Sequence, residues 1–82
     1  MIVTHHARRK WAERFQGISL EEEWRRAKPC PRKVRAALRK TCPEHKQFMR
    51  ATFNGRYLLA TDRVVFVVTP PEVVITVLRR PQ

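Results

Sequence analysis

The chain has 82 residues, with 18 Lys and Arg against seven Asp and Glu, so its formal net charge at pH 7 is +11. A chain of this length forms one domain, residues 1–82, with a thin core, and its surplus charge favours an anionic partner. No stretch approaches the ~20 apolar residues of a membrane span, and no predicted helix sets a broad apolar face opposite a basic one, so a membrane partner is disfavoured. The first residues lack the apolar segment of a signal peptide, and we expect a cytoplasmic protein.

The first predicted helix begins at Thr4 or His5, after a short strand or extended lead-in, and runs to about Phe15. Ala7, Trp11 and Phe15 are spaced four residues apart, so a helix places them in one row that can dock on a core.

The second predicted helix begins after Ser19, which forms a capping box with Glu22. The acidic residues at 21–23 suit the positive end of the helix dipole, and Pro29 is expected to end the helix. Its predicted buried face consists of Leu20, Trp24 and Ala27.

A basic insert follows at about 28–50, and it contains a third predicted helix that Pro31 opens and that reaches about Lys40. The predicted inward face of this helix consists of Val34, Ala37 and Leu38. A helix with almost no compensating acid in a chain of this charge suggests an anionic partner. The expected binding residues of the insert are Arg32, Lys33, Arg35, Arg39, Lys40, Lys46 and Arg50.

Three β-rich runs follow, at 56–61, 64–69 and 73–78, with short turn-forming segments between them. Short connections imply antiparallel neighbours, hence a meander. The second and third runs are almost continuously apolar, so both faces of the sheet should be buried, with helices on one face and a partner or the basic segment on part of the other. The expected fold class is α+β, with N-terminal helices packed on a C-terminal antiparallel β-meander.

Two parts of this pattern resemble the RelE/BrnT-like superfamily of small bacterial and phage proteins. The matching positions in the helical part are His6-Ala7, Lys10, Glu13-Arg14, residues 17–19 and Glu21-Glu22, and those in the strands are 64–69 and 74–79. Lys10 stands where Arg is usual, and the insert has no counterpart. The resemblance implies a RelE-like fold, and in several relatives of this kind the activity is metal-free RNA cleavage by a toxin.

His6, Lys10 and Arg14 form a second row on the first helix, beside the apolar one. RNA cleavage without a metal needs an acid or base, which His6 can supply, and cations that hold the phosphate. Lys10 and Arg14 can clamp the phosphate, and Arg79 at the end of the last strand can complete the site. The same residues also suit a plainer role as solvated charges or nucleic-acid contacts.

Cys30, Cys42 and His45 allow three interpretations. They could contribute to a zinc site, but Cys30 lacks the close partner of a paired zinc motif. The cysteines could instead form a disulfide, or remain two inert thiols, which a reducing compartment favours. We therefore expect no metal and no cofactor.

The sequence thus predicts a small basic protein, phage-type or toxin-like. Its expected partner is nucleic acid, RNA rather than DNA, or an acidic surface of a host complex that processes nucleic acid. The alternative is a metal-free endoribonuclease that acts on RNA or on ribosome-bound mRNA.

Overall fold

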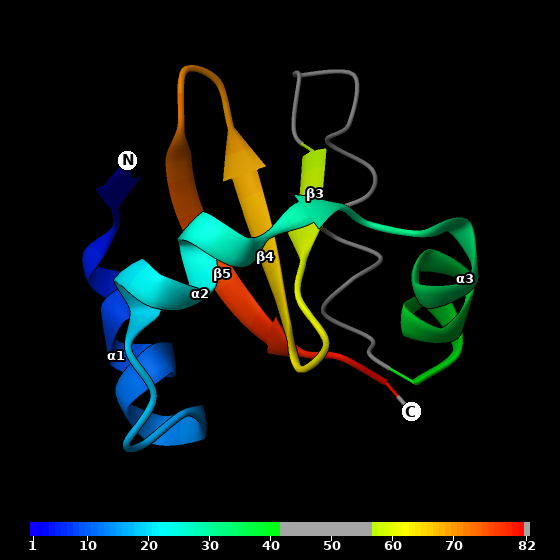
Figure 1. Ribbon diagram of the computed structural model, residues 1–82, viewed down its shortest axis with the longest axis horizontal. Helices are drawn as coiled ribbons and strands as arrows, with labels where there is room; N and C mark the ends of the chain where they lie inside the picture. Colours follow the sequence, from blue (N-terminus) through cyan, green and yellow to red (C-terminus); the bar gives the residue numbers. More distant parts are fainter. Residues whose placement is uncertain (42–56, 82) are drawn as a thin grey trace.

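A five-stranded sheet forms the centre of the protein in the computed structural model, which describes residues 1–41 and 57–81 (Figure 1). The strands are β1 (Ile2–Val3), β2 (Lys28–Pro29), β3 (Tyr57–Ala60), β4 (Val64–Thr69) and β5 (Val73–Arg79). The helices are α1 (His5–Arg14), α2 (Leu20–Arg26) and α3 (Arg32–Thr41). Helices precede the long strands in the chain, so the α+β prediction is confirmed.

The three long strands form the predicted antiparallel meander. Phe66 at the centre of β4 lies opposite Leu59 of β3 and Val77 of β5. The complete sheet is wider, in the order β1-β5-β4-β3-β2, and it is mixed because β1 runs parallel to β5. The meander was predicted, but the parallel pairing of β1 was not, because the chain enters the sheet before α1 instead of through a hairpin.

Residues 28 and 29 were assigned to the basic insert, but they form β2, which pairs with β3 at the other edge of the sheet. Pro29 has no N–H to donate, so it fits an edge strand, and it favours extended backbone at Lys28 before it. Helix α2 consequently ends at Arg26, and its C-cap Ala27 is already extended.

Both N-terminal helices begin where the sequence predicts. The Thr4 hydroxyl accepts a hydrogen bond from the Ala7 amide at 3.1 Å, and the Ser19 hydroxyl accepts one from the Glu22 amide at 3.3 Å. Each bond satisfies a backbone donor in the first turn that has no partner within the helix.

The side chains of β4 alternate between two hydrophobic cores, one on each face of the sheet. The first core contains Ala7, Trp11, Phe15 and Leu20 from the α1–α2 side, packed on Val64, Phe66, Val68, Val74 and Val77. The second contains Val34 and Leu38 of α3, packed on Leu58, Ala60, Val65, Val67 and Leu78. Both faces are therefore buried as expected, and the basic helix α3 covers the second face.

Phe66 is fully buried at the centre of the first core. Its ring stacks on Trp11 at a centroid distance of 6.0 Å and meets Trp24 edge-on at 5.5 Å. Trp24 remains half-buried, whereas Leu20 and Glu23 are the buried residues of α2. The predicted buried face of this helix was therefore wrong in one respect, because it omitted Glu23.

The N-cap of α2 gives a direct test of this local structure. We expect Ser19→Ala to lower the free energy of unfolding by about 1 kcal/mol, because the Glu22 amide loses its acceptor. Urea denaturation followed by circular dichroism measures the change. Ser19→Asp should retain most of the stability, and equal stability of all three proteins would contradict the capping role.

Candidate functional site

The row predicted on α1 does not form one anion cage. The Lys10 ammonium lies 3.3 Å from the Glu13 carboxylate, and the Arg14 guanidinium donates a hydrogen bond to the carbonyl oxygen of Val77 at 2.9 Å. His6 is exposed on the first turn of the helix. It lies about 12 Å along the helix axis from Arg14, which is too far for one phosphate group to contact both ends of the row.

Arg79 lies at the end of β5, opposite Val64 of β4, and it is exposed. Arg14 contacts the same strand two residues earlier, at Val77. The structure therefore brings Arg14 and Arg79 to the same end of β5 and leaves His6 at the other end of α1. The ribonuclease alternative stays a prediction.

Most carboxylates of the described residues pair with cations, on the α1–α2 side of the sheet and at the turns. Glu21 pairs with Arg8 at 3.9 Å, and Glu72 pairs with the N-terminal ammonium at 3.6 Å. Asp62, in the turn between β3 and β4, pairs with Arg26 at 3.4 Å. Together with the pair of Glu13 and Lys10, these contacts offset much of the positive charge on this part of the surface.

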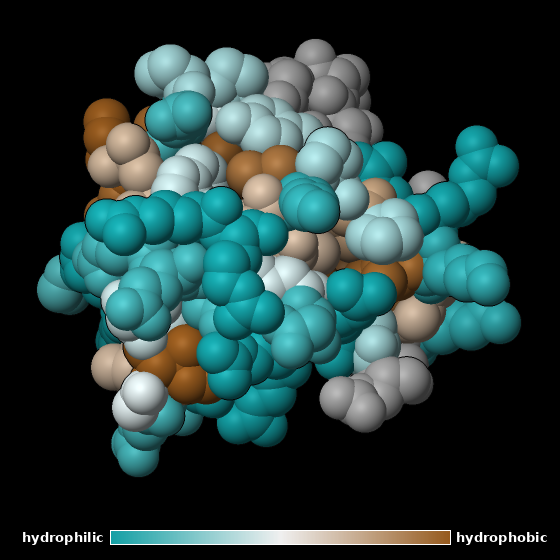
Figure 2. Space-filling view, viewed as in Figure 1, coloured by the Kyte–Doolittle hydropathy of each residue, from teal (hydrophilic) through white to brown (hydrophobic). Residues whose placement is uncertain are grey.

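Helix α3 carries the opposite pattern, because it contains no acidic residue. Within residues 1–41 and 57–81, no ion pair joins Arg32, Lys33 or Lys40 to a carboxylate, and all three are exposed. Arg35 is half-buried on the same helix, and Arg39 also belongs to it. Figure 2 shows long hydrophilic side chains projecting at the α3 end of the molecule. The remaining predicted binding residues, Lys46 and Arg50, lie outside the described residues.

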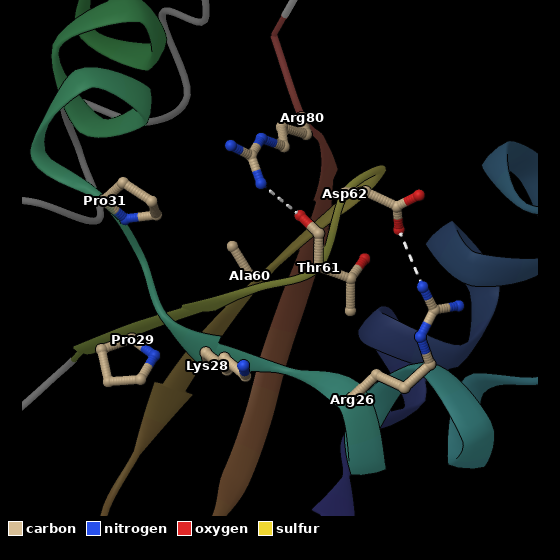
Figure 3. A pocket seen from close by; sticks show the side chains of 8 residues that line it. All are labelled: Arg26, Lys28, Pro29, Pro31, Ala60, Thr61, Asp62 and Arg80. Carbon is tan, nitrogen blue, oxygen red and sulfur yellow. Dashed lines mark hydrogen bonds and ion pairs between the residues drawn. The ribbon is translucent and has the colours of Figure 1, made fainter.

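A hollow of about 330 Å³ lies between β2, the β3–β4 turn and the residue after β5 (Figure 3). We call it the proline hollow, and it is lined by Arg26, Lys28, Pro29, Pro31, Ala60, Thr61, Asp62 and Arg80. The Arg80 guanidinium donates a hydrogen bond to the Thr61 carbonyl at 2.7 Å, and the Arg80 amide donates one to the Arg63 carbonyl at 3.0 Å. These two bonds fix Arg80 against the turn. The sequence analysis did not identify Lys28 or Arg80 as site residues, because only the pairing of β2 with β3 brings them together.

A buried carboxylate holds α2 to the β3–β4 turn. The side chain of Glu23 is 2% exposed, and its Oε1 accepts a hydrogen bond from Arg63 Nε at 2.7 Å and lies 3.6 Å from Arg26 Nη1. Its Oε2 is buried with no hydrogen-bond partner among the described residues. The spacing from Leu20 could have identified this burial, since positions 20, 23, 24 and 27 share one side of a helix.

Cys30 lies between β2 and α3 as a half-buried free thiol. Burial raises the pKa of this thiol, and the positive charges of Arg35 and Arg80 oppose that rise. Cys42 and His45, the other members of the zinc alternative, lie outside the described residues, and no cluster of three metal-binding side chains occurs within 1–41 and 57–81.

Comparisons of the chain with protein-family models, with curated proteins and with solved structures gave no match. The resemblance to RelE/BrnT-like proteins therefore remains a prediction. In the part of the chain that the structure describes, no helix has the length and apolar character needed to cross a membrane.

The raised pKa of Cys30 predicts slow alkylation. In a Cys42→Ser variant, iodoacetamide should modify the folded protein more slowly at pH 7.5 than the urea-unfolded protein, because the thiolate is the nucleophile. The rate in the folded protein should also rise at a higher pH than in urea, and this shift separates a raised pKa from simple shielding. Identical pH profiles in both states would contradict the prediction.

Proposed function

We propose that the protein binds nucleic acid, RNA rather than DNA, through the basic surface of α3. The observation that carries the proposal is the run of exposed cations on α3, which no described carboxylate neutralises. The choice of RNA follows from the resemblance of the sequence to RelE/BrnT-like proteins, because several relatives of this kind cleave RNA.

The geometry of α3 suits contact with a phosphate backbone. The helix packs against the sheet through Val34 and Leu38, and its residues Arg32, Lys33 and Lys40 are exposed. The exposed cations extend from Arg32 to Lys40, about 12 Å along the helix axis. Neighbouring like charges on one helix repel each other, and a polyanion relieves this repulsion while it releases its own condensed counterions.

The α1 surface is a weaker candidate although it is also rich in arginine. Lys10 and Arg8 face carboxylates, and Arg14 is occupied by a backbone carbonyl of β5. Binding there would require these contacts to be exchanged or shared. Contacts to phosphates hold a protein on nucleic acid without reading its sequence, so we expect binding through α3 to depend weakly on base sequence.

Two triple variants test the proposal at equal net charge. Arg32→Gln with Lys33→Gln and Lys40→Gln removes three charges from α3, and Arg8→Gln with Arg9→Gln and Arg25→Gln removes three from α1 and α2. All six residues are exposed, and each variant lowers the net charge from +11 to +8, since 11 − 3 = 8.

Affinity for a single-stranded RNA of about 12 nucleotides should be measured between 50 and 200 mM salt by fluorescence anisotropy. The α3 variant should bind more weakly than the control, and its slope of log K against log salt should be shallower by about 2, as expected for three lost phosphate contacts. Equal losses in the two variants would overturn the role of α3. Equal binding of polyglutamate with the same dependence on α3 would favour an acidic protein surface over RNA.

A further inference from the structure

We infer that the proline hollow binds the terminal phosphate of the single strand that lies along α3. This inference rests on the proposed function and adds a defined subsite to it. It assigns Lys28 and Arg80, which the sequence did not single out, as the residues that recognise the phosphate.

The two cations suit this role in different ways. Arg80 Nη1 is held at 2.7 Å by the Thr61 carbonyl, so the guanidinium is oriented before a ligand arrives and can present other N–H groups to a phosphate. Lys28 is exposed on β2, and no hydrogen bond or ion pair joins its side-chain ammonium to another of the described residues. An ordered guanidinium and an exposed ammonium that line the same hollow are a favourable setting for a phosphate, because little side-chain freedom remains to be lost at Arg80.

The single carboxylate that lines the hollow points away from these cations. Figure 3 shows the Asp62 carboxylate directed toward Arg26 on α2, while the Arg80 guanidinium points toward Pro31. The Asp62 Oδ1 is paired with Arg26 Nη2 at 3.4 Å. The charge of Asp62 is thus partly offset by Arg26, and Lys28 and Arg80 are left to attract an anion.

The remaining wall of the hollow is apolar. Pro29, Pro31 and Ala60 lie beside the cations, and neither proline has an N–H group that would need another acceptor. A volume of about 330 Å³ falls at the lower end of the range for small-molecule sites. The hollow therefore has room for a phosphate and part of the sugar or base attached to it.

The hollow lies at the start of α3, because Pro31, which lines it, directly precedes Arg32, the first residue of that helix. The positive charges of Arg35 on α3 and of Arg80 both act on the Cys30 thiol, which lies between β2 and α3. On the far side of the hollow, Arg26 pairs with Asp62 and Glu23, and Arg63 pairs with Glu23. The α3 cations therefore lead to a hollow whose other lining charges, Arg26 and Asp62, are paired with each other, and we expect it to hold the end of the strand and its terminal phosphate.

The test compares RNA oligonucleotides of one sequence that carry a 5′ phosphate, a 3′ phosphate or neither. We expect the wild-type protein to bind one of the phosphorylated forms about ten-fold more tightly than the form with two free hydroxyls, as charge-assisted hydrogen bonds would give. Lys28→Gln with Arg80→Gln should abolish this preference and leave the affinity for the unphosphorylated RNA within a few-fold of the wild type.

Arg25→Gln with Arg79→Gln is the matched control. It also lowers the net charge from +11 to +9, since 11 − 2 = 9, and Arg79 is the exposed neighbour of Arg80 that does not line the hollow. This control should keep the preference. A wild-type protein that binds all three RNAs equally, or a preference that survives in the Lys28 and Arg80 variant, would overturn the subsite and leave binding through α3 intact.

A titration with inorganic phosphate tests the hollow without RNA. In ¹H–¹⁵N NMR spectra of the wild-type protein, the amides of Ala60 and Thr61 should shift more than those of α3, and these shifts should be lost in the Lys28 and Arg80 variant. Shifts confined to α3, or no saturable shift, would count against the subsite. Absence of all RNA binding together with no shift would overturn both proposals.

Discussion

The central strand β4 is buried on both faces, and most of the structure follows from that constraint. Val64 and Phe66 point into one core, and Val65 and Val67 point into the other. A strand of this kind needs a cover on each side of the sheet. The α1–α2 pair supplies one cover, and α3 supplies the other, so α3 must be amphipathic. The sheet requires a helix on this face, and the basic surface of α3 is the side of that helix that faces the solvent.

The same arrangement separates the paired charges from the unpaired ones. Glu23 is buried beneath α2 and receives Arg63 from the β3–β4 turn. A carboxylate at this depth is stable only with a partner, so α2 and the turn are held together and the cations beside them are engaged. This contact also fixes the turn to which Arg80 bonds. The ordered cation of the proline hollow thus depends on a buried ion pair on the other side of the turn.

Local patterns predicted the elements well because local interactions determine them. Ser19 caps α2 through a bond that spans three residues, and the bounds of β4 match the β-rich run at 64–69. The missed features depend on contacts between distant parts of the chain. Arg14 donates to Val77, and Lys28 pairs across the sheet with Ala60. Neither contact has a local signature, so the row on α1 was interpreted as a phosphate clamp, and the hollow was not predicted.

The net charge of the protein is +11. What a partner encounters, however, depends more on how this charge is distributed over the surface. The sheet and its two cores lie between α1 and α3, and a helix and a sheet each add about 10 Å of thickness. Charges on the two covers are therefore separated by more than the Debye length of about 8 Å at physiological salt. Neighbouring cations on α3 lie within that length of each other, about 5–6 Å apart between Cβ atoms at i, i+3 and i+4. A polyanion near α3 consequently responds to the local group of cations, and the carboxylates around α1 and α2 do little to weaken that attraction.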